Sequence, residues 1–322
     1  MNQDELEATL IVDLYDSLGG KTVTSVSGGK SSAYMAVHYP TDYYVFALVL
    51  TRDPTCSVKD KGLLREILNK CPCFEGSREL DQTIRNVLDL EQLIGSEIVW
   101  VYGDTFDKVI EDKSFFLPNA RTRYCTSMMK VLPIWHWCYS NILNPVLDEN
   151  GELLSVDPCK MQLGFRFDER RRVYKSLGAT PTHLSGHDWS KAGACELMNV
   201  VSLKCDIAGK FAGKHRRLKT VEWRYQLFPL WYDYITQSDV IKYWDSLGWE
   251  FPQVSNCDYC FFHTKAQHLI QHQIHPERSR WWMGLEEDTG RTFKSDVSLR
   301  SLLYEDVNTS QHEEVDSCFC SD

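Results

Sequence analysis

The sequence lacks the segments that would direct a chain into or across a membrane. None of its apolar runs reaches the length of a membrane span, about 18 residues. Its N-terminus, MNQDELEATL, is acidic and has neither the basic nor the apolar region of a signal peptide. We therefore expect a cytoplasmic protein with no membrane partner. Its 12 cysteines are then expected to be free thiols, metal ligands or redox groups rather than disulfides.

The chain also lacks internal repeats, low-complexity blocks and an excess of positive charge. Its 322 residues suffice for one large domain or two small ones, and a hydrophobic content of 43% is enough to form a core. Because the net charge is −10, a nucleic-acid partner would need a local basic patch. Residues 210–219, KFAGKHRRLK, form the strongest patch, with Trp223 and Tyr225 nearby for stacking on bases. A soluble charged loop explains this patch equally well.

The sequence does contain a glycine-rich turn between a predicted strand and a predicted helix, in residues 22–35, TVTSVSGGKSSAYM. Gly28 and Gly29 have no Cβ, so the backbone can turn sharply there and approach a ligand closely. Ser31 and Ser32 suit the first turn of the helix. Several backbone N–H groups and the positive end of the helix dipole would then point at one spot. This arrangement predicts a phosphate site.

Lys30 adds a mobile positive charge to this predicted site. The turn is not a Walker A loop, because the first glycine of that motif falls on Thr24. It resembles the pyrophosphatase-type loop, SGGxDS, of the adenine-nucleotide α-hydrolase superfamily. The matching residues are Ser27, Gly28, Gly29, Lys30, Ser31 and Ser32, with Ser31 in place of the usual Asp. An ordinary glycine-rich turn is the alternative.

The segments around the turn predict an α/β fold with a mostly parallel sheet. Residues 43–51, YYVFALVLT, form a near-continuous apolar run that is typical of a strand buried on both faces. Strand, helix and strand at this spacing form a βαβ unit. Residues 98–102 and 161–167 are further strand candidates. Asp53 follows the 43–51 strand, at the sheet edge where α/β proteins bind ligands, although a helix cap or turn is an equally good role for it.

The remaining pattern divides the chain into four regions. We expect an N-terminal helix over residues 1–20, a nucleotide-binding α/β domain over 21–250, a Cys/His-rich helical region over 251–305 and an acidic, disordered tail over 306–322. Within the α/β domain, residues 140–159 are predicted to form an insertion or hairpin. Residues 175–222 are predicted to form an irregular surface excursion.

Four further motifs follow the loop in the order expected of one branch of the superfamily. Residues 123–133 are similar to R-x-C-[TS]-x-x-x-K-x-x-P, and residues 164–172 resemble G-[IF]-R-x-D-E-x-x-R. Residues 228–244 resemble P-L-x-x-W…D-V…Y-W, and residues 256–261 resemble a late C-x-x-C motif. Over roughly residues 22–287, the chain therefore resembles the phosphoadenosine phosphosulfate (PAPS) reductase family and the related DNA phosphorothioation sulfurtransferases.

This resemblance implies a sheet of the adenine-nucleotide α-hydrolase (HUP) type, with helices on both faces. It implies that ATP, or a sulfonucleotide (PAPS or APS), binds with Mg²⁺ at residues 27–32 and near Asp53. Catalytic roles then fall on Lys30, Cys125, Arg166, Asp168 and Arg172. Independently, guanidinium groups that follow a strand suit phosphate or sulfate, with a solvated charged face as the alternative. Asp168 would hold magnesium or pin those arginines.

Cysteines of two motifs predict a metal site. Cys257 and Cys260 have the spacing of metal ligands, and Cys125 is the only other cysteine inside a family motif. Three thiolates suit a [4Fe–4S] cluster, although Tyr124 stands where cluster-bearing sulfonucleotide reductases usually have a second cysteine. Plain buried thiols are one alternative. Zinc is another, because three histidines follow the C-x-x-C motif: His263, His268 and His272.

Three functions are compatible with these motifs. The leading hypothesis is ATP-dependent adenylylation followed by sulfur transfer through the cluster, from a sulfur donor to an acceptor that includes nucleic acid among the candidates. The alternative is a sulfonucleotide reductase that releases sulfite with a thioredoxin-like reductant, but the E-C-G-L-H tail of those enzymes is absent. The third is a non-catalytic nucleotide-binding module, which the Ser31 change leaves open.

Overall fold

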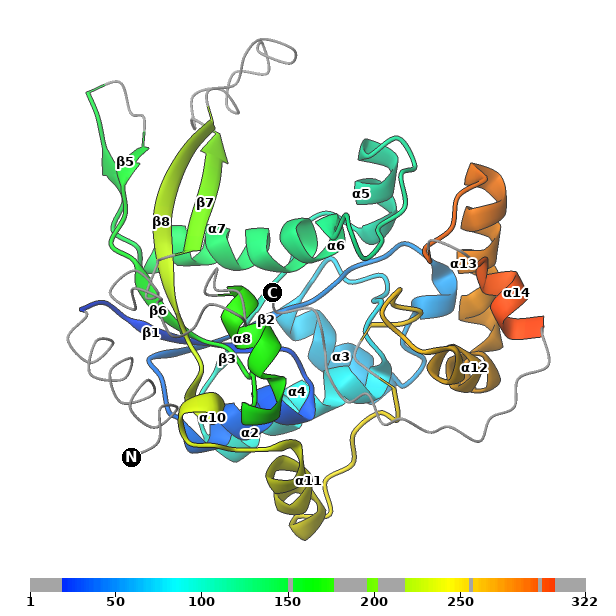
Figure 1. Ribbon diagram of the computed structural model, residues 1–322, viewed down its shortest axis with the longest axis horizontal. Helices are drawn as coiled ribbons and strands as arrows, with labels where there is room; N and C mark the ends of the chain where they lie inside the picture. The colour runs from blue at the N-terminus through cyan, green and yellow to red at the C-terminus, as the bar shows by residue number, and fades with distance from the viewer. Residues whose placement is uncertain are drawn as a thin grey trace. The chain divides into compact units, whose positions relative to one another are not determined.

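The computed structural model describes residues 19–149, 153–176, 196–201, 218–254, 257–294 and 297–304 (Figure 1). The expected N-terminal helix, the side chains of the basic patch and the acidic tail lie outside these residues. The chain divides into two compact units. Unit 1 comprises residues 1–25, 34–44 and 135–246, and unit 2 comprises residues 26–33, 45–134 and 247–322. None of the described helices is long and apolar enough to cross a membrane.

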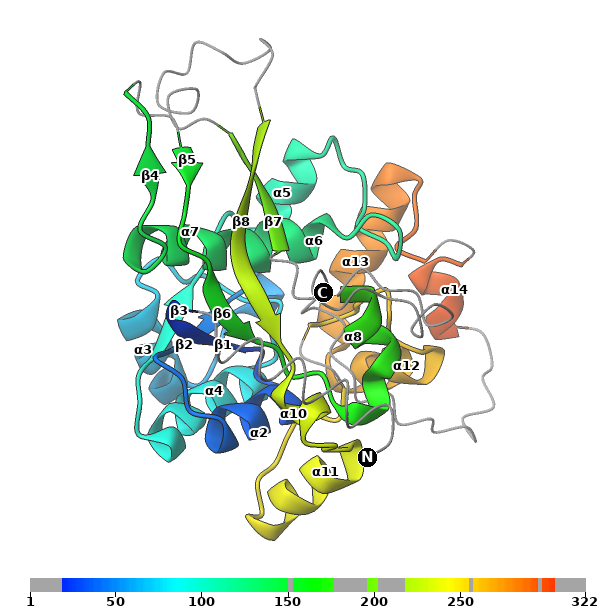
Figure 2. The same cartoon turned by 60° about the vertical axis from the view of Figure 1, so that its left-hand side comes forward.

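Two parallel pairings of the main sheet are made by residues of unit 1. Strand β1 (Thr22–Val26) pairs in parallel with β6 (Cys159–Gln162), and β6 pairs in parallel with β8 (Leu218–Leu227). Strand β7 (Glu196–Val201) pairs antiparallel with β8, and Figure 2 shows the two side by side as a long ribbon. Unit 1 also contains α8 (Arg170–Ser176), α10 (Pro229–Tyr232), α11 (Gln237–Ser246) and most of α7 (Leu132–Asn141).

Strand β2 (Tyr43–Ala47) has residues in both units. The described strands of the main sheet follow the order β3-β2-β1-β6-β8-β7. In unit 2, β3 (Ile98–Val101) lies beside the end of β2, and the Leu48 N–H donates to the Val101 carbonyl at 2.9 Å. The helix α2 (Lys30–His38) follows β1 directly. The expected α/β fold with a mostly parallel sheet is confirmed.

Two sequence predictions for unit 1 are wrong. The strand expected at residues 161–167 is β6, which already ends at Gln162, because Phe165 turns into the core and stacks on Phe228 with 5.4 Å between ring centroids. Of the irregular excursion expected at residues 175–222, residues 177–195 and 202–217 lie outside the described residues, and the described remainder contains β7 and the first part of β8. By contrast, the hairpin expected at residues 140–159 is present as the antiparallel pair β4 (Val146–Leu147) and β5 (Leu153–Ser155).

The helices of unit 2 begin and end at residues with the expected capping chemistry. The Asp60 carboxylate accepts from two backbone N–H groups at the start of α3 (Lys61–Lys70), and Gly95 ends α4 (Asp81–Ile94) in the left-handed conformation. The Thr105 hydroxyl caps α5 (Phe106–Asp112). A reciprocal capping box between Thr264 and Gln267 starts α12 (Lys265–Ile274). Figure 1 shows α12 grouped with α13 (Pro276–Thr289) and α14 (Leu299–Tyr304).

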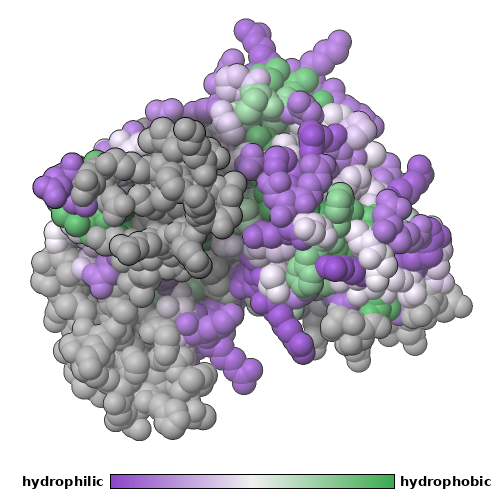
Figure 3. All heavy atoms as spheres, turned by 90° about the horizontal axis from the view of Figure 1, so that it is seen from above, coloured by the Kyte–Doolittle hydropathy of each residue, from purple (hydrophilic) through white to green (hydrophobic). Residues whose placement is uncertain are grey.

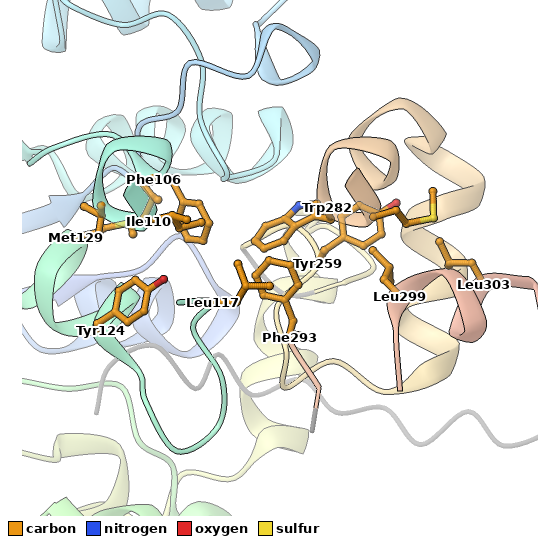
Figure 4. Packing of buried hydrophobic residues seen from close by; sticks show 13 residues of the cluster. Phe106, Ile110, Leu117, Tyr124, Met129, Tyr259, Trp282, Phe293, Leu299 and Leu303 are labelled. Carbon is orange, nitrogen blue, oxygen red and sulfur yellow. The ribbon is translucent and has the colours of Figure 1, made fainter. Parts of the chain in front are cut away.

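The core of unit 2 joins these C-terminal helices to the segment around α5. In Figure 4, Phe106, Tyr124 and Met129 face a second group that includes Tyr259 and Trp282. Burial of large aromatic and aliphatic side chains from distant segments stabilises their association. The core cluster therefore holds segments that are more than a hundred residues apart in one compact unit. On the face in Figure 3, the coloured side chains are mostly hydrophilic with small hydrophobic patches.

Candidate functional site

The predicted phosphate loop is closed by its own serine hydroxyls. The Ser32 hydroxyl accepts from the Ser27 N–H at 3.1 Å, donates to the Gly29 carbonyl at 3.1 Å and lies 2.9 Å from the Ser27 hydroxyl. Ser32 is buried, whereas Lys30 and Ser31 are half-buried at the start of α2. The serine that the sequence places last in the motif therefore braces the turn.

Gly28 is required by the packing of this loop within unit 2. Its φ is +76°, a value that side chains rarely allow. A Cβ at this position would lie 2.6 Å from Thr83 Cγ2 and 3.3 Å from Val87 Cγ2, both on α4. The loop thus rests on α4 with no space for a side chain at Gly28. The predicted strand–turn–helix is present, and its role in nucleotide binding stays a prediction.

Asp53 is engaged in two interactions at the end of the segment that follows β2. Its carboxylate caps the 3-10 helix η1 (Pro54–Cys56) by accepting from the Thr55 N–H at 3.0 Å. Its other oxygen lies 3.1 Å from Arg78 Nη1 in a fully buried ion pair. The capping role that the sequence left open is therefore present. Contact of Asp53 with a nucleotide stays a prediction.

Arg78 connects Asp53 to the C-x-x-C loop. Its guanidinium is almost fully buried and also lies 3.4 Å from Asp258, which is the residue after Cys257. A second arginine, Arg278 of α13, lies 3.8 Å from the same carboxylate. The ring of Trp281 covers the Arg78 guanidinium at 3.7 Å. Two buried carboxylates are thus compensated by two buried arginines, as burial of charge requires.

A buried thiol completes this charged group. Cys56 Sγ lies 3.4 Å from Arg78 Nη1 and 3.8 Å from Asp258 Oδ2. Burial, reinforced by the nearby Asp258 charge, raises the pKa of Cys56 to about 12. Cys56 therefore stays a neutral thiol at physiological pH. The sequence did not predict this group of Cys56, Arg78 and Asp258, and the position of Asp258 inside the C-x-x-C motif was the one available signal.

The C-x-x-C loop is attached through its backbone to the segment of Arg78 and Glu79. Glu79 and Cys257 form an antiparallel bridge, and the Asp258 N–H donates to the Arg78 carbonyl at 2.9 Å. Tyr259 has a φ of +47° and its N–H donates to Gln271 of α12 at 2.8 Å. The turn between the two cysteines is therefore fixed from two sides.

Lys130 places a positive charge beside Cys257. Its Nζ lies 3.5 Å from Cys257 Sγ and 3.1 Å from Glu79 Oε1, and the Glu79 oxygen lies 3.6 Å from the same sulfur. Lys130 belongs to the π-helical segment η2 (Ser127–Val131), which follows α6 (Tyr124–Thr126). Such π-helical turns frequently occur at functional sites. The sequence predicted Lys130 as a motif residue but not its partners.

Cys125, Cys257 and Cys260 line one pocket of unit 2. The cavity has a volume of about 50 Å³, and its other lining residues include Arg123, Lys130 and Phe262. All three predicted thiols therefore face one small space despite their separation in the sequence. The aromatic side chains Phe106, Tyr259 and Trp282, seen in Figure 4, form part of its wall.

Iron–sulfur clusters are held by cysteine thiolates, and three cysteines from two segments line this mostly apolar cavity. In the part of the chain that the structure describes, no three His, Cys, Asp or Glu side chains are spaced to hold a metal ion. The cysteine metal site therefore stays a prediction. Of the histidines proposed for zinc, His272 is hydrogen-bonded to Ser279 at 2.8 Å, and burial lowers the pKa of His268 well below its usual range.

The arginines predicted to hold an anion lie in unit 1 and are paired with carboxylates. Arg166 forms two parallel hydrogen bonds with Asp168, each 3.1 Å long, and its backbone N–H donates to Glu169. Arg172 pairs with Glu169 and lies over the ring of Phe165 at 4.1 Å. Asp168 thus pins an arginine, as one of the two sequence interpretations held. Contacts of Arg166, Asp168 and Arg172 with substrate stay predictions.

No protein-family model and no curated protein matches the sequence. One similar solved structure is the U34-tRNA thiolase NcsA from Methanococcus maripaludis with its [4Fe-4S] cluster. It is 12% identical, with a TM-score of 0.36, and the match covers 99% of this chain and 86% of that one.

Proposed function

We propose that this chain is a PP-loop enzyme that binds ATP at residues 27–32 and transfers sulfur at the pocket of Cys125, Cys257 and Cys260. The observation that carries the proposal is the convergence of these three thiols on one cavity beside Lys130. A thiolate is the nucleophilic form of cysteine, and an adjacent lysine favours it. Cys56 also lies close to a guanidinium, 3.4 Å from Arg78 Nη1, but its burial beside Asp258 keeps it a neutral thiol and so disfavours it as the nucleophile.

In this proposal the phosphate loop binds and orients the nucleotide. Backbone N–H groups of the turn and the first residues of α2 hold the phosphates, and Lys30 neutralises part of their charge with Mg²⁺. An acceptor oxygen attacks the α-phosphorus, which forms an adenylylated acceptor and releases pyrophosphate. The adenylyl group activates the acceptor carbon for attack by sulfur. For the Ser32 hydroxyl to donate a hydrogen bond to a phosphate, it must first break its hydrogen bond to the Gly29 carbonyl.

The cysteine pocket supplies the sulfur-handling groups. Cys125, Cys257 and Cys260 would hold a [4Fe–4S] cluster, which when bound would supply a coordination site for sulfide. Lys130 stabilises negative charge on Cys257, while Glu79 fixes the position of Lys130. The apolar wall limits entry of water, which strengthens these interactions. A nucleic-acid acceptor, a sulfur donor and the anion-binding role of Arg166 and Arg172 are parts of the proposal that rest on sequence alone.

Calorimetric titration of ATP with Mg²⁺ into the anaerobically purified protein tests the nucleotide site. We expect Lys30→Ala to weaken ATP binding by at least about tenfold, because a charge contact to phosphate is lost. Lys59→Ala is the matched control, since Lys59 is an exposed lysine of unit 2 outside helices and strands. Equal affinity of Lys30→Ala and the wild type would remove residues 27–32 from the site. Sulfite release from PAPS or APS with thioredoxin would instead favour a reductase.

A further inference from the structure

Two cysteines outside the proposed site are in contact at the end of α3. Cys71 Sγ and Cys73 Sγ lie 3.7 Å apart, separated in the chain only by Pro72. The Cys71 N–H donates to the Ile67 carbonyl at 2.7 Å, and the Phe74 N–H donates to the Cys71 carbonyl at 3.1 Å. Proline fixes the backbone dihedral φ between the two cysteines. The backbone thus holds the two thiols together on one side of this turn.

The two thiols differ in their access to solvent. Cys71 is fully buried, whereas Cys73 is exposed. Burial and the neighbouring Cys73 raise the pKa of Cys71 to about 12. The Tyr102 side chain lies near both sulfurs, and burial together with the adjacent thiols raises the pKa of its hydroxyl. Cys73 is therefore the thiol that a reagent in solution meets first, and Cys71 is held behind it.

Another pair of described cysteines lacks this access. Cys138 and Cys159 interact through their thiols, which together with burial raises the pKa of Cys138 far above its usual range. Both of these side chains are fully buried. A reagent in solution therefore reaches neither sulfur of that pair. Of these two pairs, Cys71 and Cys73 are the one in which the thiols are in contact and one of them is exposed.

We propose that Cys71 and Cys73 form a dithiol that is reversibly oxidised to an intramolecular disulfide by disulfides of small thiols or of other proteins. The Cys73 thiolate attacks one sulfur of the incoming disulfide, forms a mixed disulfide and releases the first thiol. Cys71 then loses its proton to solvent and attacks Cys73 Sγ, which releases the second thiol. Two protein thiols are oxidised and one external disulfide is reduced to two thiols, so electrons and protons balance.

The chain geometry favours a labile bond rather than a structural one. The disulfide would close a loop of only three residues, so it restricts the unfolded chain very little and contributes little stability. Bonds that are strained or exposed have the higher reduction potentials of regulatory and catalytic disulfides. We therefore expect the bond to open readily when a dithiol reductant is added.

Peptide mapping of the native full-length protein tests this inference. The reduced protein is treated with oxidised glutathione, alkylated, unfolded and digested with trypsin. Cleavage after Lys70 and Arg78 yields the peptide CPCFEGSR, which contains only these two cysteines. We expect this peptide to lose the mass of two hydrogens and to carry neither glutathione nor alkyl groups. Dithiothreitol should restore two alkylatable thiols.

The buried Cys56 provides the internal control. Its tryptic peptide, DPTCSVK, should stay reduced in the same sample, because the thiol is inaccessible while the protein is folded. Cys73→Ser should leave Cys71 unmodified by glutathione, and Cys71→Ser should stop at a stable mixed disulfide on Cys73. Wild-type protein that keeps glutathione on CPCFEGSR, or that leaves both thiols reduced, would overturn the proposal. The result is independent of ATP binding and of any cluster.

Discussion

The ammonium nitrogen of Lys130 lies 3.5 Å from the sulfur of Cys257. The same ammonium lies 3.1 Å from the buried carboxylate of Glu79, which itself lies 3.6 Å from the sulfur. The three groups therefore balance one another. The positive charge of the lysine favours the thiolate of Cys257. The negative charge of the glutamate opposes the thiolate, and the lysine offsets that effect.

Replacing Lys130 with methionine is expected to slow alkylation of Cys257 by iodoacetamide by on the order of tenfold, because a nearby positive charge promotes thiolate formation. The rate is measured by peptide mapping in a Cys260→Ser background, since Cys257 and Cys260 share one tryptic peptide.

Glu79→Gln is the matched variant with the opposite sign and should accelerate the same reaction. The double variant, Glu79→Gln with Lys130→Met, leaves no unpaired buried charge and shows whether any effect comes from unfolding. If Cys257 is alkylated as fast in the Lys130→Met, Cys260→Ser protein as in Cys260→Ser alone, this lysine has no role at Cys257.

Arg78 is expected to be a large contributor to stability. Its side chain is 2% exposed and pairs with Asp53 and Asp258, whose side chains are 2% and 1% exposed. Arg78→Met leaves these carboxylates with less compensation, which costs about 3–5 kcal/mol when one partner of a buried pair is removed. Urea unfolding gives the free energy. The exposed Arg65→Met on α3 is the control and should change stability by less than about 0.5 kcal/mol.

Some of this arrangement was predictable from the sequence and some was not. Local patterns predicted β1, the turn at Gly28 and α2, because glycine and β-branched residues act over a few positions. The motif resemblance led us to expect Cys125 beside Cys257, and both line one pocket. The pairing of Arg78 with Asp258 was not predictable, because 180 residues separate the two side chains and nothing in the sequence specifies their contact.

The missed strands have a different cause. In β8, the buried Val221 and Trp223 alternate with the exposed Glu222, which is the pattern of a half-buried strand. This pattern follows a long segment rich in Gly, His and Lys. Because of that composition, the whole segment was predicted to be irregular and the strand pattern at its end was overlooked. The early end of β6 depends on the stacking of Phe165 on Phe228, a tertiary contact that no local pattern contains.

The acid stability of unit 1 should depend on Asp42. Its carboxylate accepts from the N–H and the hydroxyl of Thr22, each at 2.7 Å, and also pairs with Lys21. The Thr22 hydrogen bonds, led by the backbone N–H, lower the pKa of Asp42 from 3.8 to about 2. Because the folded pKa is depressed, the stabilisation is fully present above pH 3.8 and is lost as the pH falls through about 2.

Asp42→Asn should therefore lower the free energy of unfolding at neutral pH by about 1 kcal/mol, a modest value because the exposed carboxylate is screened by solvent. Urea unfolding of both proteins at several pH values measures the difference. It should shrink as the pH falls from about 4 toward 2. A difference that stays constant over this interval would show that Asp42 does not titrate with a depressed pKa.

The iron, zinc and sulfide content of anaerobically purified protein, with its visible absorption spectrum, tests the account of the cysteine pocket most directly. A cluster held by these three thiols predicts brown wild-type protein with iron and acid-labile sulfide, and loss of both in Cys125→Ser, Cys257→Ser and Cys260→Ser. Serine at Cys56, Cys71, Cys73 or Cys138 should leave the colour and the iron content unchanged. Colourless wild-type protein that holds zinc or no metal, or full iron content in Cys125→Ser, would contradict a cluster shared by these three thiols.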